Sequence, residues 1–261
     1  MPRYSVCMTC FNEVGTVEKS FRSLIRQLDS NFEVIVVDNF STDGTYDILR
    51  DLQYGYGIRV IQRRCSRGIG RQVAFEYASG DYIIANMDLD DFFLPVLNQI
   101  IGLYHDQVEG KMLVVFNAKP PPDMTFGWVQ NITIAPRELV ASVGGWRDLN
   151  VFEDWDIWSR ASKAGKYCWT SFKFAENETL HPEPTKPLDK LRDRYLRYWY
   201  RLKLGRKVFD RGERTSISQK LPYWGANLSL IFGGKLEGQD PEFDSQSLGL
   251  FVDLLEVQSR A

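Results

Sequence analysis

Short apolar runs alternate with segments of helical periodicity through the first half of the chain. Residues 34–37 are four consecutive aliphatic residues, which is typical of a strand buried on both faces of a sheet. A polar turn and then a helical pattern follow each run. The predicted strands are residues 4–10, 33–37, 58–61 and 82–87, and the predicted helices are residues 16–28, 45–52, 69–78 and 95–104. This alternation predicts an α/β fold, Rossmann-like, with a mostly parallel central sheet covered by helices.

The second half is less regular. Apolar runs predict further strands at residues 112–116, 127–134 and 167–174, and helical spacing predicts helices at residues 136–143 and 153–164. Residues from about 212 onward give weak signals, which indicate an irregular tail with some helix near its end.

A basic segment follows Pro187. Residues 188–207 contain eight Lys and Arg against two Asp, and leucines and tyrosines recur there at helical spacing, so we predict a basic amphipathic helix. Two interpretations of this helix stay open. It could lie on an anionic membrane surface, or it could pack its apolar stripe on the domain and leave its charges in water.

Composition excludes some classes of protein. A chain of 261 residues with 44% hydrophobic and 25% charged residues is ordinary for a globular protein, and a net charge of -2 gives no reason to expect a nucleic-acid partner. Cys7 and Cys10 form a C-x-x-C within a predicted strand, where a metal or redox role is disfavoured because no second Cys/His pair follows. The remaining two cysteines are scattered, which fits a reducing compartment. No signal-peptide pattern is visible, and no run approaches the roughly 20 apolar residues of a membrane-spanning helix. We therefore expect a cytoplasmic protein, either free or peripheral on the cytoplasmic face of the membrane.

Polar side chains follow the predicted strands at the edge where parallel α/β sheets bind ligands. Asp38 comes directly after the second strand, where its carboxylate could accept hydrogen bonds from a base or ribose, or could serve only a turn. Arg67 and Arg71 lie around the start of the third helix, beside Gly68 and Gly70. Helix N-termini and arginine side chains both favour phosphate, although Arg67 could also be a solvated surface charge.

Three aspartates lie within four residues after the fourth predicted strand: Asp88, Asp90 and Asp91. Packed together, they would repel one another unless a cation were present, and hard oxygen ligands suit Mn²⁺ or Mg²⁺. Such an ion would also neutralise charge on a departing diphosphate. The alternative is that these aspartates cap the next helix, which applies most to Asp91.

Several short motifs occur together in the chain. They are SVCMTCFNE at residues 5–13, VVDNFSTDGT at 36–45, RGIGR at 67–71, ASGDY at 78–82, NMDLDD at 86–91, GGW at 144–146 and EDWDIWSR at 153–160. In this order they resemble the family-2 glycosyltransferases of the GT-A fold, and the resemblance covers about residues 3–175. It implies one GT-A domain over residues 1–180, with a nucleotide-sugar half (1–110) and an acceptor half (111–180), and a helical extension over residues 181–261.

The resemblance implies roles on the donor side. The positions that match residues holding the nucleotide base and ribose are Thr9, Phe11, Glu13 and Asp38. Arg71 matches a position near the base and the diphosphate. Thr9 stands where proline is frequent, Phe11 where tyrosine is frequent and Asn39 where a second aspartate is frequent. These departures put the nucleotide in doubt more than the activity, and we expect a UDP-sugar in preference to a GDP-sugar.

The resemblance also implies the metal and the base. Asp88 and Asp90 match the D-x-D motif, with Asp90 and Asp91 nearest the Mn²⁺ or Mg²⁺ ion. His181 matches a late histidine that some relatives use as a further metal ligand, although a lone histidine is more often an ordinary loop residue. Asp154, paired with Glu153, matches the catalytic base, which would take the acceptor's proton in one inverting displacement.

We therefore predict a hexosyl- or N-acetylhexosaminyltransferase that moves a sugar from a nucleoside-diphosphate sugar to a glycan or glycolipid hydroxyl. Trp146, directly after two glycines, is a candidate platform for the acceptor sugar, or else a core residue. One alternative is a polyprenyl-phosphate sugar synthase, although the GGW and ED motifs resemble the glycan-extending branch more. The other is a catalytically silent sugar- or nucleotide-binding module, against which the retention of all the acidic positions argues.

Overall fold

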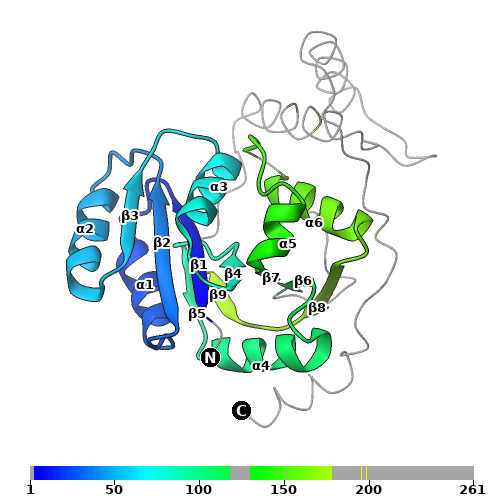
Figure 1. The fold of residues 1–261 in the computed structure, drawn as a ribbon. Helices are drawn as coiled ribbons and strands as arrows, with labels where there is room; N and C mark the ends of the chain where they lie inside the picture. Colours follow the sequence, from blue (N-terminus) through cyan, green and yellow to red (C-terminus); the bar gives the residue numbers. More distant parts are fainter. Residues whose placement is uncertain (1–2, 118–129, 151, 178–194, 196–197, 199–261) are drawn as a thin grey trace, which may run out of the picture.

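A computed structural model of the chain describes residues 3–117, 130–150 and 152–177, together with Tyr195 and Tyr198. Within these residues the centre is a seven-stranded sheet (Figure 1) with the strand order β3-β2-β1-β4-β7-β6-β8. β7 is antiparallel to both neighbours, and the other strands share one direction, so the predicted mostly parallel sheet is confirmed. The strands are β1 (Tyr4–Cys10), β2 (Phe32–Asp38), β3 (Arg59–Gln62), β4 (Tyr82–Ala85), β6 (Leu113–Asn117), β7 (Asn131–Pro136) and β8 (Tyr167–Ser171).

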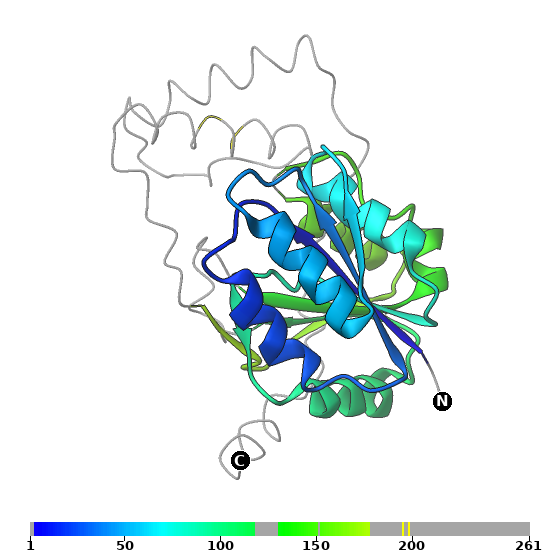
Figure 2. The same ribbon diagram turned by 90° about the vertical axis from the view of Figure 1, so that its left-hand side faces the viewer.

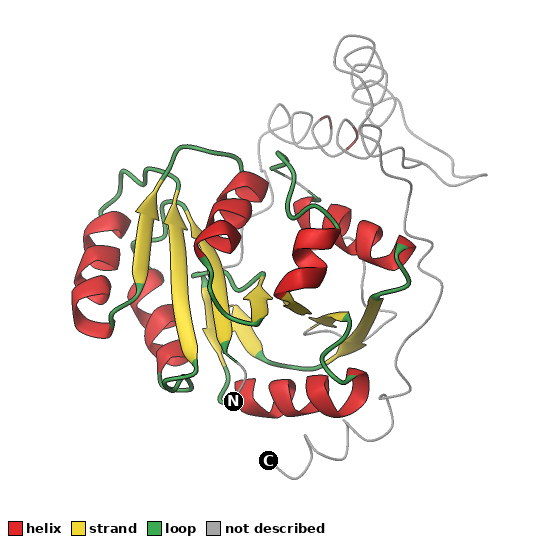
Figure 3. Cartoon of the chain, viewed as in Figure 1, coloured by secondary structure: helices red, strands yellow, loops and turns green. Residues whose placement is uncertain are grey.

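Helices cover both faces of the sheet, which Figure 3 shows as yellow strands between red helices. α1 (Val17–Ile25), α2 (Thr45–Tyr56) and α4 (Leu97–Val108) pack in one apolar cluster. Figure 2 shows α1 and α2 side by side on that face. The other cluster contains buried residues of α3 (Arg67–Tyr77), α5 (Arg137–Ser142) and α6 (Glu153–Lys163).

The apolar run of β2 is explained by these two layers. Val34 and Val36 belong to the α1 side of the core, whereas Ile35 and Val37 belong to the α3 side, and each is at most 6% exposed. Because successive side chains of a strand point to opposite faces, a strand buried on both sides needs an unbroken apolar sequence. The strand register also aligns Cys10 with Asp38, so the carboxyl ends of β1 and β2 meet at one edge.

A second, two-stranded sheet was not expected from the sequence. β5 (Asp91–Phe93) pairs antiparallel with β9 (Ala175–Asn177). Asp91 therefore begins a strand, and α4 starts at Leu97 with Val96 as its N-cap residue. The interpretation of Asp91 as a helix cap is wrong, because the chain continues in β conformation after the acidic cluster.

The C-terminal predictions fall mostly outside the described residues. Tyr195 and Tyr198 of the predicted basic helix are helical, and the boundary at residue 180, the rest of segment 188–207 and the tail are not described. Among the described residues, no helix combines the length and the apolar character needed to cross a bilayer.

Candidate active site

Arg71 joins the two halves of the sheet edge. It lies on α3 with a side chain that is 2% exposed, and its Nη2 lies 3.7 Å from Asp88 Oδ1 and 3.4 Å from Glu153 Oε1. Its Nε lies 3.2 Å from Asp154 Oδ1. Asp88 follows β4 and the other two carboxylates begin α6, so one buried guanidinium brings together acids that are far apart in the chain. The sequence placed Arg71 in the site without indicating this role.

Burial shapes the titration of the two acids of α6. It raises the pKa of Glu153, and Asp154 raises it further, while Arg71 and Arg67 lower it. Burial also raises the pKa of Asp154, with Arg71 acting against it, Asp88 adding to it and the amide of Asn86 lowering it. The side chain of Asp154 is 17% exposed and that of Glu153 3%, so Asp154 is the more accessible of the two carboxylates.

Glu13 faces the acidic cluster from the loop after β1. Burial raises the pKa of its carboxyl to about 8, and Asp88 and Asp90 raise it in addition, whereas a hydrogen bond from Cys10 and the charge of Arg67 lower it. These three carboxylates are thus close enough to disfavour one another's charge. A divalent cation would relieve that repulsion, so the donor set fits Mn²⁺ or Mg²⁺.

No three carboxylate, imidazole or thiol groups of the described residues converge tightly enough to hold a metal ion alone. A Mg²⁺ or Mn²⁺ ion at this edge would therefore need substrate phosphates and water as further ligands, as is usual for Mg²⁺. Asp91 is a poorer candidate than Asp90, since it is 4% exposed and its Oδ1 accepts a hydrogen bond of 2.6 Å from Gln130 Nε2. His181 lies outside the described residues.

The edge expected to bind the base presents two exposed aromatic rings. Phe11 is 52% exposed and Phe40 is 42% exposed, with Arg64 stacked 5.7 Å from the Phe40 ring centroid. Phe40 has a φ of 57°, which is uncommon for a bulky residue and marks a constrained loop. Sequence reasoning missed Phe40, although an aromatic residue two positions beyond a strand end is a usable signal.

Asp38 does not offer the open carboxylate expected from the sequence. It is completely buried, and its oxygens accept hydrogen bonds from the backbone N–H of Ser41 at 3.1 Å and from Gln62 Nε2 at 3.0 Å. The carboxylate therefore holds the loop that carries Phe40, and its burial argues against a direct contact with a ribose. Thr9 is half-buried beneath α3, where a Cβ on Gly70 would lie 2.9 Å from its Cγ2.

The N-terminus of α3 is also not free to bind phosphate. The N–H of Arg67 donates to Asn150 Oδ1 at 3.0 Å, and the N–H of Gly68 donates to the carbonyl of Leu149 at 2.8 Å. The N–H of Ile69 donates to the Ser66 side chain at 3.2 Å. The expected helix-end phosphate site is therefore wrong for the backbone. The side chain of Arg67, 43% exposed and 3.8 Å from Glu153, is the group left to meet a phosphate.

Trp146 is not an acceptor platform, because it is 3% exposed and its ring packs 6.2 Å from that of Phe75 in the core. Two other aromatic residues flank Glu153 and Asp154 in the sequence. Phe152 and Trp155 are half-buried, with ring centroids 6.3 Å apart, on either side of the Glu153–Asp154 pair. These rings are the apolar surface that lies nearest to Asp154 along the chain.

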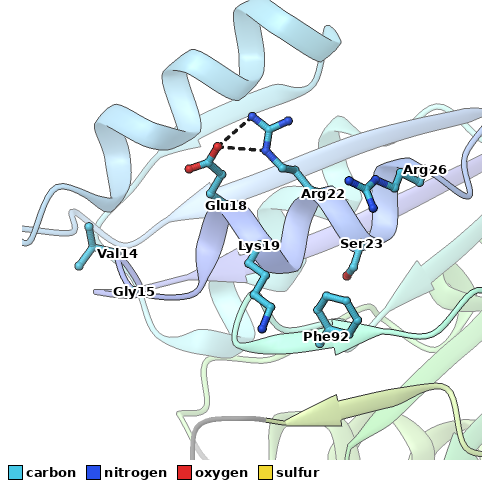
Figure 4. A pocket seen from close by; sticks show the side chains of 8 residues that line it. All are labelled: Val14, Gly15, Glu18, Lys19, Arg22, Ser23, Arg26 and Phe92. Atoms are coloured by element: carbon cyan, nitrogen blue, oxygen red, sulfur yellow. Dashed lines mark hydrogen bonds and ion pairs between the residues drawn. The ribbon is translucent and has the colours of Figure 1, made fainter.

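A separate groove of about 400 Å³ runs along α1 (Figure 4). It is lined by Val14, Gly15, Glu18, Lys19, Arg22, Ser23, Arg26 and Phe92. Glu18 Oε1 forms an ion pair with Arg22 Nη2 at 2.8 Å, and Lys19 Nζ lies 5.2 Å from the Phe92 ring centroid. Since α1 and α6 pack on opposite faces of the sheet, this groove lies away from Asp154.

Comparison with known proteins agrees with this arrangement. Residues 5–158, more than half of the chain, match the model of "Glycosyl transferase family 2". The chain is 33% identical over 125 residues to EpsE of Bacillus subtilis (strain 168), covering 44% of this chain and 45% of that one. It is 27% identical over 139 residues to the Escherichia coli UDP-Glc:alpha-D-GlcNAc-diphosphoundecaprenol beta-1,3-glucosyltransferase WfaP, covering 49% and 55%. The aligned segments thus span about half of each relative.

The fold is also similar to that of a solved structure, the mannosyltransferase PcManGT from Pyrobaculum calidifontis in complex with GDP-Man and Mn²⁺. The TM-score is 0.60 at 16% sequence identity, and the match covers 100% of this chain and 80% of that one. At this identity the likeness shows the fold, which is the GT-A fold.

Proposed function

Because the chain belongs to glycosyl transferase family 2, we propose that it transfers a hexosyl or N-acetylhexosaminyl group from a nucleoside-diphosphate sugar to a hydroxyl of a glycan or glycolipid. The observation that carries this proposal is the contact of Arg71 with both Asp88 and Asp154. This contact brings Asp88, which belongs to the acidic cluster suited to a metal ion and a diphosphate, close to Asp154, whose pKa is raised by burial. A site that only bound a nucleotide would have no need for the second part.

Asp154 acts as the general base. As the acceptor oxygen bonds to the anomeric carbon of the donor, its proton passes to the Asp154 carboxylate. The bond from the anomeric carbon to the diphosphate oxygen breaks, and its electron pair leaves with the nucleoside diphosphate. One such displacement inverts the anomeric centre. Burial raises the pKa of Asp154, which makes its carboxylate a stronger base than an exposed one, and a positioned base contributes roughly 10²–10⁴-fold in rate.

The leaving diphosphate is negatively charged, and this chain offers two means of holding it. Arg67 directs a partly exposed guanidinium to the edge where Glu153 lies. Asp90, with Asp88 and Glu13 nearby, would hold a divalent cation, which when bound neutralises charge on the diphosphate. Arg71 is too buried to follow the leaving group, so it holds the two sets of acids in place.

The exposed rings of Phe11 and Phe40 suit stacking on a nucleotide base. We favour a UDP-sugar as the donor. The Escherichia coli relative is named as an enzyme that uses UDP-Glc. The half-buried rings of Phe152 and Trp155 beside the base suit the apolar face of an acceptor sugar.

A donor screen tests the proposal. The full chain is incubated with UDP- and GDP-sugars, a set of glycan and glycolipid acceptors and Mn²⁺, and release of nucleoside diphosphate is recorded. We expect acceptor-dependent release with at least one UDP-sugar, abolished by a chelator and restored by Mn²⁺. Tight nucleotide binding without release for any donor and acceptor pair would favour a silent binding module instead.

A further inference from the structure

The loop before α6 is fastened to α3 by hydrogen bonds at three points. The N–H of Trp146 donates to Gln72 Oε1 at 2.9 Å, and the N–H of Gly68 donates to the carbonyl of Leu149 at 2.8 Å. At the end of the loop, Asn150 Oδ1 accepts the N–H of Arg67 at 3.0 Å. The loop therefore follows the first turns of α3 closely before the chain enters α6.

Two glycines permit this close approach. A Cβ on Gly68 would lie 2.0 Å from the carbonyl oxygen of Arg147. This oxygen belongs to the backbone, so it cannot move aside as the end of a flexible side chain could. A Cβ on Gly145 would lie 2.1 Å from Gln72 Oε1, and Gly145 also has a φ of 60°. At Gly68 the neighbouring atom belongs to the backbone, so a side chain there would require the loop to move away from α3.

The same loop is fastened to α6. Arg160 Nη2 donates to the carbonyl of Gly145 at 2.6 Å and contacts Asp156 Oδ2 at 2.6 Å. Arg147 Nε lies 3.5 Å from the same Asp156 oxygen, on a carboxylate side chain that is 1% exposed. The described part of this loop, residues 145–150, is thus a connector that contacts both α3, which carries Arg71, and α6, which carries Asp154.

Asn150 holds a particular place in this connector. It is the loop side chain that accepts from the first backbone N–H of α3, and it lies three positions before Glu153. Arg67 is engaged at both ends, since its N–H meets Asn150 and its side chain lies 3.8 Å from Glu153. Asn150 is itself exposed, so its replacement leaves the core unchanged.

We propose that Asn150 is a positioning residue for sugar transfer: by accepting the N–H of Arg67, it sets the start of α6 against α3 and so places Asp154 for the acceptor hydroxyl. This inference rests on the proposed function. Asn150 acts through the connector and does not touch the substrate. Small displacements of a reacting group lower the rate strongly, so the effect falls on kcat rather than on nucleotide binding.

The test compares Asn150→Ala with Asn150→Asp in the full chain. Asn150→Ala removes the acceptor, and we expect a kcat roughly 10–100-fold lower with unchanged donor KM and unchanged UDP affinity. Asn150→Asp keeps an acceptor oxygen at a helix N-terminus that favours negative charge, so it restores the rate. The matched control is Gln53→Ala, which removes a side-chain acceptor of the Val60 N–H (3.2 Å) remote from the site and leaves kcat unchanged.

A wild-type kcat in Asn150→Ala, or an Asn150→Asp variant as slow as Asn150→Ala, would overturn the proposal. Hydrogen exchange gives a readout that does not depend on turnover. Amides of residues 67–72 exchange faster in Asn150→Ala than in wild type and regain protection in Asn150→Asp. If no donor is turned over, the proposed function fails, and this comparison still decides whether Asn150 holds α3: unchanged exchange in Asn150→Ala would refute it.

Discussion

Arg71 Nε lies 3.2 Å from Asp154 Oδ1, and the arginine side chain is 2% exposed. Burial lowers the pKa of the guanidinium, but Asp154, Asp88 and Glu153 together raise it above its usual value. The Arg71 side chain therefore stays positively charged, and its charge offsets the negative charges of these three carboxylates. The candidate base is held in its position by a group that also fixes the acidic edge of the donor half.

Arg71→Gln should destabilise the protein by about 3–5 kcal/mol, because removal of one partner leaves buried carboxylates uncompensated. Burial already raises the pKa values of Glu153 and Asp154, and loss of the arginine raises them further. Carboxyl groups that bind a proton more readily in the folded state than in the unfolded state lower the free energy of unfolding at pH values above their unfolded pKa. The difference in stability between wild type and Arg71→Gln therefore shrinks as the pH falls toward about 4. Urea unfolding of wild type and variant across this pH range measures it.

Arg59→Gln is the control, since Arg59 is exposed and lies 5.6 Å from the ring centroid of Tyr77. Its loss should change stability by less than about 1 kcal/mol at every pH. Equal effects of the two substitutions would contradict the role given to Arg71.

Gly68→Ala and Gly102→Ala should have opposite signs. A Cβ at Gly68 would lie 2.0 Å from the Arg147 carbonyl oxygen, so we expect a loss of about 1–3 kcal/mol from overpacking. Gly102 lies in α4 with open space where a methyl group would stand, so alanine should stabilise by about 0.5–1 kcal/mol through helix propensity. Thermal unfolding of both variants checks this, and a stabilised Gly68→Ala would show that the loop does not press on α3.

Glu33 should make stability depend on acid pH. Burial alone raises its pKa, but hydrogen bonds from Ser5, Ser79 and Gly80 outweigh this and lower it. A carboxyl with a lowered folded pKa stabilises above its unfolded pKa of about 4.3, and the contribution is lost as the pH falls through the folded value. Glu33→Gln should cost about 1–2 kcal/mol at pH 7 and flatten the stability profile between about pH 5 and 3. A parallel decline of both proteins in urea titrations would refute this assignment.

Asp90→Asn and Asp91→Asn should separate metal binding from folding. Asp90→Asn should weaken Mn²⁺ binding in the presence of UDP by at least about tenfold, with little change in stability. Asp91→Asn should lower stability by about 1 kcal/mol, because a neutral amide oxygen accepts the 2.6 Å hydrogen bond from Gln130 more weakly than a carboxylate does, and should leave Mn²⁺ affinity near wild type. Calorimetric titration with thermal unfolding measures both quantities, and the reverse pattern would assign the metal to Asp91.

The strands of the sheet were predictable because each is an apolar run with its own turn. β1 lies at residues 4–10 as expected, since alternate side chains of this run serve two separate cores. β5 and β9 were not predictable, because each has only three residues and its partner lies more than 80 residues away in the sequence, which leaves no local pattern. β7 ends at Pro136, two residues beyond the predicted strand end, because a proline can occupy the last position of a strand.

Site residues were predictable in kind more than in orientation. The order of motifs placed Glu13, Asp90 and Asp154 near one edge, but it did not tell which side chains face solvent. Trp146 follows two glycines whether its ring points inward or outward, and only packing on Phe75 decides. The Asp38 carboxylate likewise accepts a hydrogen bond from the loop at Ser41, and the path of that loop depends on tertiary contacts.

The most direct test of the central claim is sugar transfer by Asp154→Asn, with UDP binding measured on the same preparation. Asparagine keeps the shape but cannot take the acceptor's proton. We predict that UDP binding stays near wild type while transfer falls roughly 10²–10⁴-fold, and that Asp106→Asn, on the exposed face of α4, changes neither. Transfer near the wild-type rate in Asp154→Asn would show that the base lies elsewhere.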